Sequence, residues 1–78
     1  MKNYEVVSIL LPTLRRTHFF LYAYENLYEY KNGVYVEITE DTIYAYTNAS
    51  RIVHNLKEEE INRSAAALTA SIIGSRTV

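Results

Sequence analysis

The chain has 78 residues, contains no cysteine, and carries a formal net charge of −1, with 22% of its residues charged. This length leaves room for a single domain, residues 1–78, close to the lower size at which an ordinary core offsets chain entropy. The missing cysteines exclude a disulfide scaffold, and the near-zero charge excludes a protein held to nucleic acid by bulk positive charge. A core this small also favours support from a dimer mate or a partner protein.

Residues 4–11 form a nearly continuous apolar run in which β-branched and aromatic side chains predominate, and Pro12 follows it. This composition predicts a buried strand over 4–11, since proline cannot donate to a ladder. The run is too short for a signal peptide or a membrane span, so we expect a soluble, cytoplasmic protein. Residues 16–24 are dense in aromatic side chains and predict a second strand.

A helix over about 13–31 is the alternative for this region. Leu14, His18 and Leu21 fall at helical spacing, and Gly33 lies just past the end of such a helix. The sequence leaves both interpretations open.

Asn32-Gly33 gives the clearest local signal, because a two-residue turn needs φ > 0 at both positions and these residue types tolerate it best. The flanking residues therefore predict two strands, 27–31 and 34–47, joined in a hairpin. The turn also fixes the register, which pairs Lys31 with Val34, Tyr30 with Tyr35, Glu29 with Val36, Tyr28 with Glu37, and Leu27 with Ile38.

Residues 49–73 change to helical periodicity, with Asn48 as an N-cap. Two apolar stripes result, and on one straight helix they would point in nearly opposite directions. Either the helix breaks near Asn55, or it is continuous and the second stripe meets another copy of the chain in a homodimer. The first stripe is Ala49, Ile52, Val53 and Leu56, and the second is Ile61, Ala65, Leu68 and Ile72.

These elements predict an α+β fold, an antiparallel meander of three to four strands (about 4–11, 16–24, 27–31 and 34–47) with one or two C-terminal helices (about 49–73) on one face.

Catalytic and metal-binding patterns are missing from the sequence. His18 and His54 are far apart, Asp41 is the single aspartate, and no nucleophile turn accompanies them. Neither His-x-x-x-His nor paired cysteines occur, and the two glycines, Gly33 and Gly74, do not form a phosphate-binding loop. We therefore expect a protein that is not an enzyme, with no catalytic residue, metal site or cofactor.

Eight tyrosines in 78 residues are the most informative feature of the composition. Tyrosine combines apolar area with a hydroxyl group and is enriched at binding surfaces. If the sheet packs its aliphatic face on the helices, the opposite face is exposed, aromatic and acidic. The alternative is that both faces are covered and the tyrosines fill a small core. The predicted binding residues are Tyr22, Tyr24, Tyr28, Tyr30, Tyr35 and Glu37.

Charge is concentrated in the same region, since residues 25–41 hold one lysine against four glutamates and one aspartate. This acidic segment predicts a protein partner with a basic surface, which the carboxylates of Glu25, Glu29, Glu37, Glu40 and Asp41 would steer. Small proteins rich in acids and aromatics resemble the inhibitors encoded by phages and mobile elements, including anti-CRISPR proteins that block a nucleic-acid channel. The resemblance lies in size and surface character, so it assigns no role to any residue.

Two other functions compete with this hypothesis. A single-stranded nucleic-acid-binding protein would stack tyrosines on bases and place Arg15, Arg16, Lys31 and Arg51 on phosphates, although the acidic segment opposes it. A homo-oligomeric structural protein would use the second helical stripe as its interface.

Overall fold

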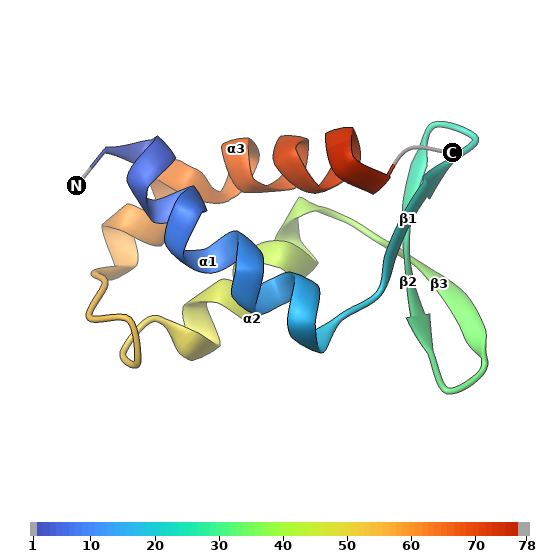
Figure 1. The fold of residues 1–78 in the computed structure, drawn as a ribbon, viewed down its shortest axis with the longest axis horizontal. Coiled ribbons are helices and arrows are strands. Elements are labelled where there is room, and N and C mark those ends of the chain that lie inside the picture. Colours follow the sequence, from blue (N-terminus) through green and yellow to red (C-terminus); the bar gives the residue numbers. More distant parts are fainter. Residues whose placement is uncertain (1, 77–78) are drawn as a thin grey trace.

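The computed structural model describes residues 2–76 and confirms the α+β class. Three antiparallel strands form one sheet in the order β1-β2-β3, and the sheet stands at one end of three helices (Figure 1). In chain order the elements are α1 (Asn3–Thr17), β1 (Phe20–Ala23), β2 (Asn26–Lys31), β3 (Val34–Ile38), α2 (Glu40–Ser50) and α3 (Glu58–Arg76).

The first element is a helix, so the strand predicted over 4–11 is wrong. Val6, Leu10 and Leu14 recur at every fourth position and are all buried, which gives α1 one core-facing stripe. The remaining aliphatic residues of the run, Val7, Ile9 and Leu11, flank this stripe and are half-buried, so the sequence showed little polar alternation. Packing of this stripe outweighs the β-propensity of the run. Pro12, expected to end the element, lies inside the helix on its exposed side.

The segment 16–24 is a strand only over Phe20–Ala23, and the alternative helix over 13–31 does not continue past Thr17. A two-residue turn at Tyr24-Glu25 follows, with φ angles of 53° and 63°. Because neither residue is glycine or asparagine, this turn has no recognisable signal in the sequence. It pairs Ala23 with Asn26 and makes β1-β2 a tight hairpin.

The hairpin at Asn32-Gly33 forms as predicted, with φ angles of 50° and 88°, and the β2-β3 register agrees at every pair. The strand predicted over 34–47 ends at Ile38, however, because α2 begins at Glu40. Two acids in its first turn favour this start, since carboxylates stabilise a helix N-terminus.

The C-terminal region contains two helices, α2 and α3, and the connection between them, 51–57, includes Asn55, near which a break was predicted. The predicted start at Asn48 is wrong, because Asn48 lies inside α2, whose N-cap is Thr39. Asn55 adopts φ 58° in the connection between them, a conformation that asparagine tolerates. The second stripe, which was a candidate interface with another copy of the chain, lies instead in the chain's own core, where Leu68 and Ile72 are each 1% exposed. From the first stripe, Leu56 joins the core, whereas Ile52 and Val53 are exposed.

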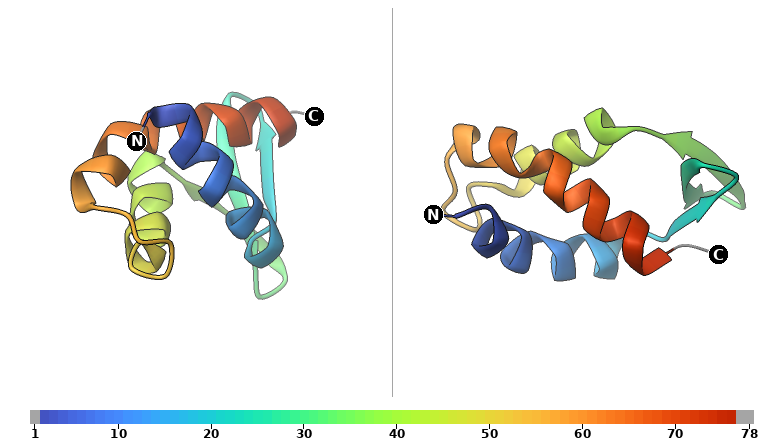
Figure 2. Two further views of the ribbon diagram at one scale, coloured as in Figure 1. Left: turned by 60° about the vertical axis from the view of Figure 1, so that its left-hand side comes forward. Right: turned by 90° about the horizontal axis from the view of Figure 1, so that it is seen from above.

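The helices pack together and cover one face of the sheet (Figure 2). α3 contacts α1, α2 and β1, and α2 also contacts β3. The hydrophobic core extends from the helices to the sheet through the buried side chains of Phe20, Leu27 and Ile38. In the part of the chain that the structure describes, none of the helices is both long and apolar enough to cross a membrane.

Candidate binding surface on the sheet

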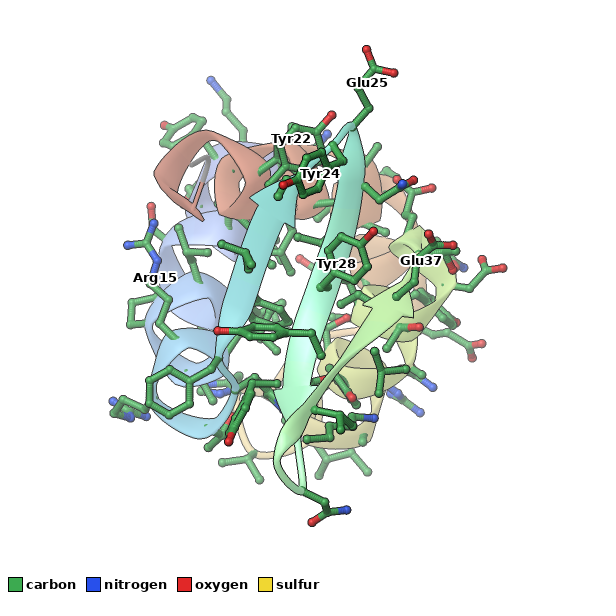
Figure 3. The ribbon with its side chains drawn as sticks, turned by 90° about the vertical axis from the view of Figure 1, so that its right-hand side faces the viewer. Arg15, Tyr22, Tyr24, Glu25, Tyr28 and Glu37 are labelled. Carbon is green, nitrogen blue, oxygen red and sulfur yellow. The ribbon has the colours of Figure 1, made fainter. Side chains whose placement is uncertain are left out.

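The sheet presents its second face away from the helices (Figure 3). Residues paired directly across antiparallel strands share a face, so the registers place each side chain. Leu21 pairs with Tyr28, Tyr28 with Glu37, and Tyr30 with Tyr35, while the backbone N–H of Tyr30 donates to the carbonyl of Phe19 at 2.9 Å. We call this surface the outer face, and its residues are Phe19, Leu21, Tyr28, Tyr30, Tyr35 and Glu37.

Three aromatic rings at one end of the outer face are unusually accessible. Phe19 is 76% exposed, Tyr35 is 56% exposed and Tyr30 is 46% exposed. The rings of Tyr30 and Tyr35 meet edge to face, with centroids 5.2 Å apart and planes at 63°. Together with Phe19 they line a shallow hollow of about 240 Å³, which we call the aromatic hollow. Exposed apolar area gathered in this way is typical of interaction sites.

Four of the six predicted binding residues lie together on the outer face: Tyr28, Tyr30, Tyr35 and Glu37. Tyr22 does not, because it pairs with the buried Leu27 on the inner face and packs against the core. Tyr24 stands in the tight turn at the tip of the β1-β2 hairpin and is 91% exposed (Figure 3).

The turn at Tyr24-Glu25, which was not predicted from the sequence, also explains why Phe19 was not among the predicted binding residues. A two-residue turn pairs even-numbered with odd-numbered positions, so even positions face inward in β1 and odd positions face inward in β2. In a single extended strand Phe19 and Leu27 would share a face, but the turn places Phe19 on the outer face and leaves Leu27 buried on the inner one. Recognising the turn at Tyr24-Glu25 would have added Phe19 to the predicted site.

Three carboxylates gather where the sheet meets α2 and α3. Glu25 lies at the β1-β2 turn, Glu37 on β3, and Glu40 at the first position of α2. These three side chains line a second hollow of about 270 Å³, whose floor includes Leu27 and Ile38. The acidic rim therefore lies where the sheet meets α2.

Glu29 does not belong to this rim, which corrects the prediction that it steers a partner. It is 3% exposed on the inner face, where Oε2 lies 2.5 Å from Nδ1 of His18 and the Tyr46 hydroxyl donates to Oε1. The imidazole also stacks on Tyr46, with centroids 4.0 Å apart. Lys31 Nζ completes the group, 3.7 Å from Oε1. The charge of Glu29 is therefore compensated inside the molecule.

The contacts among His18, Glu29, Lys31 and Tyr46 change two pKa values. Burial raises the pKa of Tyr46, and the hydrogen bond to Glu29 raises it further, because both disfavour the phenolate. The pKa of Lys31 is also raised, chiefly through its interaction with Tyr46 and then by the Glu29 carboxylate. These polar atoms satisfy one another, so the group stabilises the junction of α1, α2 and the sheet.

A larger open hollow of about 760 Å³ lies between α1 and α3, lined by Tyr4, Val7 and Ala67 among others. Its two serine hydroxyls are used within their own helices, since Ser8 donates to the Tyr4 carbonyl at 2.8 Å and Ser71 to the Ala67 carbonyl at 3.0 Å. The remaining polar side chains of its lining are Lys2, Asn3 and Arg63.

Within residues 2–76, no group of three or more histidine, aspartate or glutamate side chains is placed to hold a metal ion. Comparison of the chain with protein-family models, with curated proteins and with solved structures finds no match. The functional argument therefore depends on the chemistry of the outer face.

Proposed function

We propose that this chain is a non-enzymatic protein-binding module whose outer face docks on a partner with a basic surface. The observation that carries the proposal is the row of exposed rings on a sheet face that none of the three helices covers. Aromatic side chains bury a large area at a low cost in side-chain entropy, which suits the centre of an interface. An inhibitor that occupies the basic channel of a nucleic-acid-binding protein would have this surface character.

The carboxylates of the acidic rim support a basic partner. Glu25, Glu37 and Glu40 line one hollow where the sheet meets α2 and α3, and Asp41 follows in the first turn of α2. Rim charges of one sign accelerate association with a surface of opposite sign, and this effect weakens as salt screens it.

Single-stranded nucleic acid is the competing ligand class, and the positions of the cations count against it. Lys31 interacts with Glu29 and Tyr46 rather than with the outer face. Arg51 follows the end of α2 that lies away from the sheet, and Arg16 is turned toward Thr13. Arg15 lies on α1 at the edge of the view onto the outer face (Figure 3). One cation at that edge does not form a continuous path for phosphates beside the rings.

The test is capture of a partner by the wild-type chain and by two matched variants. Tyr30→Ala/Tyr35→Ala removes two rings of the outer face, whereas Tyr4→Ala removes a ring from α1 that is 66% exposed. Circular dichroism checks that both variants fold. We expect the first variant to lose a partner that the second retains, and Glu25→Gln/Glu37→Gln to slow its association at low salt.

Retention of the partner by folded Tyr30→Ala/Tyr35→Ala would show that the outer face is not the binding surface. Binding of any oligonucleotide, weakening steeply with salt, would instead assign the surface to nucleic acid.

A further inference from the structure

We infer that the aromatic hollow receives a cationic side chain, an arginine or a lysine, from the protein partner. The inference depends on the proposed function and specifies how the outer face recognises that partner. It assigns Phe19, Tyr30 and Tyr35 as the cation-binding residues and Glu37 as the neighbouring counter-charge.

The lining of the hollow is the first argument. Phe19, Tyr30 and Tyr35 come from three adjacent segments of the sheet, and only these three side chains line the hollow among the described residues. Each aromatic face carries a negative electrostatic potential, so a cation placed within about 6 Å of a ring centroid is attracted to it. The volume of about 240 Å³ accommodates a guanidinium or ammonium group with its neighbouring methylenes.

The surrounding charges are the second argument. Glu37 lies on the same face as Tyr35, two residues farther along β3; it does not line the aromatic hollow, but it is the charged residue of that strand. Lys31, although adjacent in sequence to Tyr30, lies on the opposite face beside Glu29. The charge nearest to the hollow along the strands of the outer face is therefore negative, which favours a cation over a phosphate.

Accessibility is the third argument. A partner side chain can approach because the hollow is open to solvent and all three rings are more than 40% exposed. Arginine and lysine also bring an aliphatic stem that packs on aromatic rings while the charged head stays near water and carboxylate. An apolar side chain would gain the ring contacts but no attraction to Glu37.

The experiment uses two peptides that differ only in charge. The probes are acetyl-Gly-Gly-Arg-Gly-Gly-amide and the same peptide with citrulline, the neutral isostere of arginine, each titrated into the full chain and followed by the NMR signals of the tyrosine rings. We expect saturable shifts at Tyr30 and Tyr35 with the arginine peptide, a dissociation constant in the millimolar range, and binding of citrulline weaker by at least threefold. Equal affinity for the two peptides, or shifts with neither, overturns the inference.

Variants then test the assigned residues. Removal of one ring by Tyr35→Leu should weaken arginine binding about two- to fivefold, whereas Tyr35→Phe retains the ring and most of the affinity. Glu37→Gln should lower the preference for arginine over citrulline. Tyr4→Leu, on α1, is the control and should change neither value. A Tyr35→Leu variant that binds like the wild type overturns the assignment.

The two proposals fail in different ways. A partner that is captured through Tyr30 and Tyr35, combined with peptides that bind regardless of charge, would leave the outer face as the interface and remove the cation-binding role. Capture that ignores both tyrosines removes the proposed function itself.

Discussion

Replacing His18 by phenylalanine should destabilise the fold through the buried carboxylate beside it. The His18→Phe variant keeps a ring against Tyr46 but removes the donor 2.5 Å from Glu29, whose side chain stays buried. A hydrogen bond to a charged group contributes about 1.5–3 kcal/mol. At roughly 0.05–0.15 kcal/mol per residue, the free energy of unfolding of a chain of this length is about 4–12 kcal/mol, so the lost hydrogen bond is a large fraction of the total stability.

Thermal and urea unfolding followed by circular dichroism measure this effect. A domain of this size changes its Tm by about 4–8 °C per kcal/mol, so we expect a decrease of about 6–24 °C. In a Glu29→Gln background the same replacement removes a bond between neutral groups and should cost only about 0.5–1.5 kcal/mol. Equal losses in the two backgrounds, or a His18→Phe variant as stable as the wild type, would refute the role assigned to the carboxylate.

Three further predictions concern other features of the fold. Pro12→Ala restores a backbone donor within α1 and should raise the free energy of unfolding by about 1–3 kcal/mol in urea; an unchanged midpoint would contradict the strain expected of this proline. Tyr24→Asn/Glu25→Gly places residues that tolerate positive φ at both turn positions and should raise the free energy of unfolding by about 1–2 kcal/mol. An unchanged free energy in urea denaturation would contradict the strain assigned to this turn. Because the pKa of Tyr46 is raised, its contribution to the free energy of unfolding is complete below the unfolded-state pKa near 10 and is lost as the pH rises through the folded-state pKa. Tyr46→Phe should therefore remove one phenol that ionises at high pH from the absorbance titration. It should also remove part of the loss of stability at alkaline pH.

The hairpin was the most predictable part of the structure because its information is local. Asn32-Gly33 specifies a turn, the turn specifies a register, and the register determines which of Tyr28, Tyr30 and Tyr35 share a face. The placement of these three tyrosines on the outer face therefore followed from the sequence. Their role in binding stays a prediction.

The misassigned elements depended on information that local composition does not carry. Residues 4–11 have the composition of a strand, and only packing of the Val6 and Leu10 stripe in the core makes them helical. Glu29 carries a charge and lies in an acidic segment, yet His18 and Tyr46 from other elements provide the partners that allow its burial. Both outcomes depend on contacts that are distant in sequence.

Two features of the sheet depart from the usual partition of side chains, and they are the strongest reason to propose a function for the outer face. A carboxylate is buried at position 29, where an aliphatic residue would pack without desolvating a charge, while Phe19 and Tyr35 are left in solvent. The turn between β1 and β2 adds strain, since Tyr24 is held at φ 53° where asparagine or glycine would be relaxed. None of the exposed rings stabilises the core, so stability alone does not account for them. We propose that a partner covers these rings, and loss of binding without loss of stability in Tyr30→Ala/Tyr35→Ala is the result that this proposal requires.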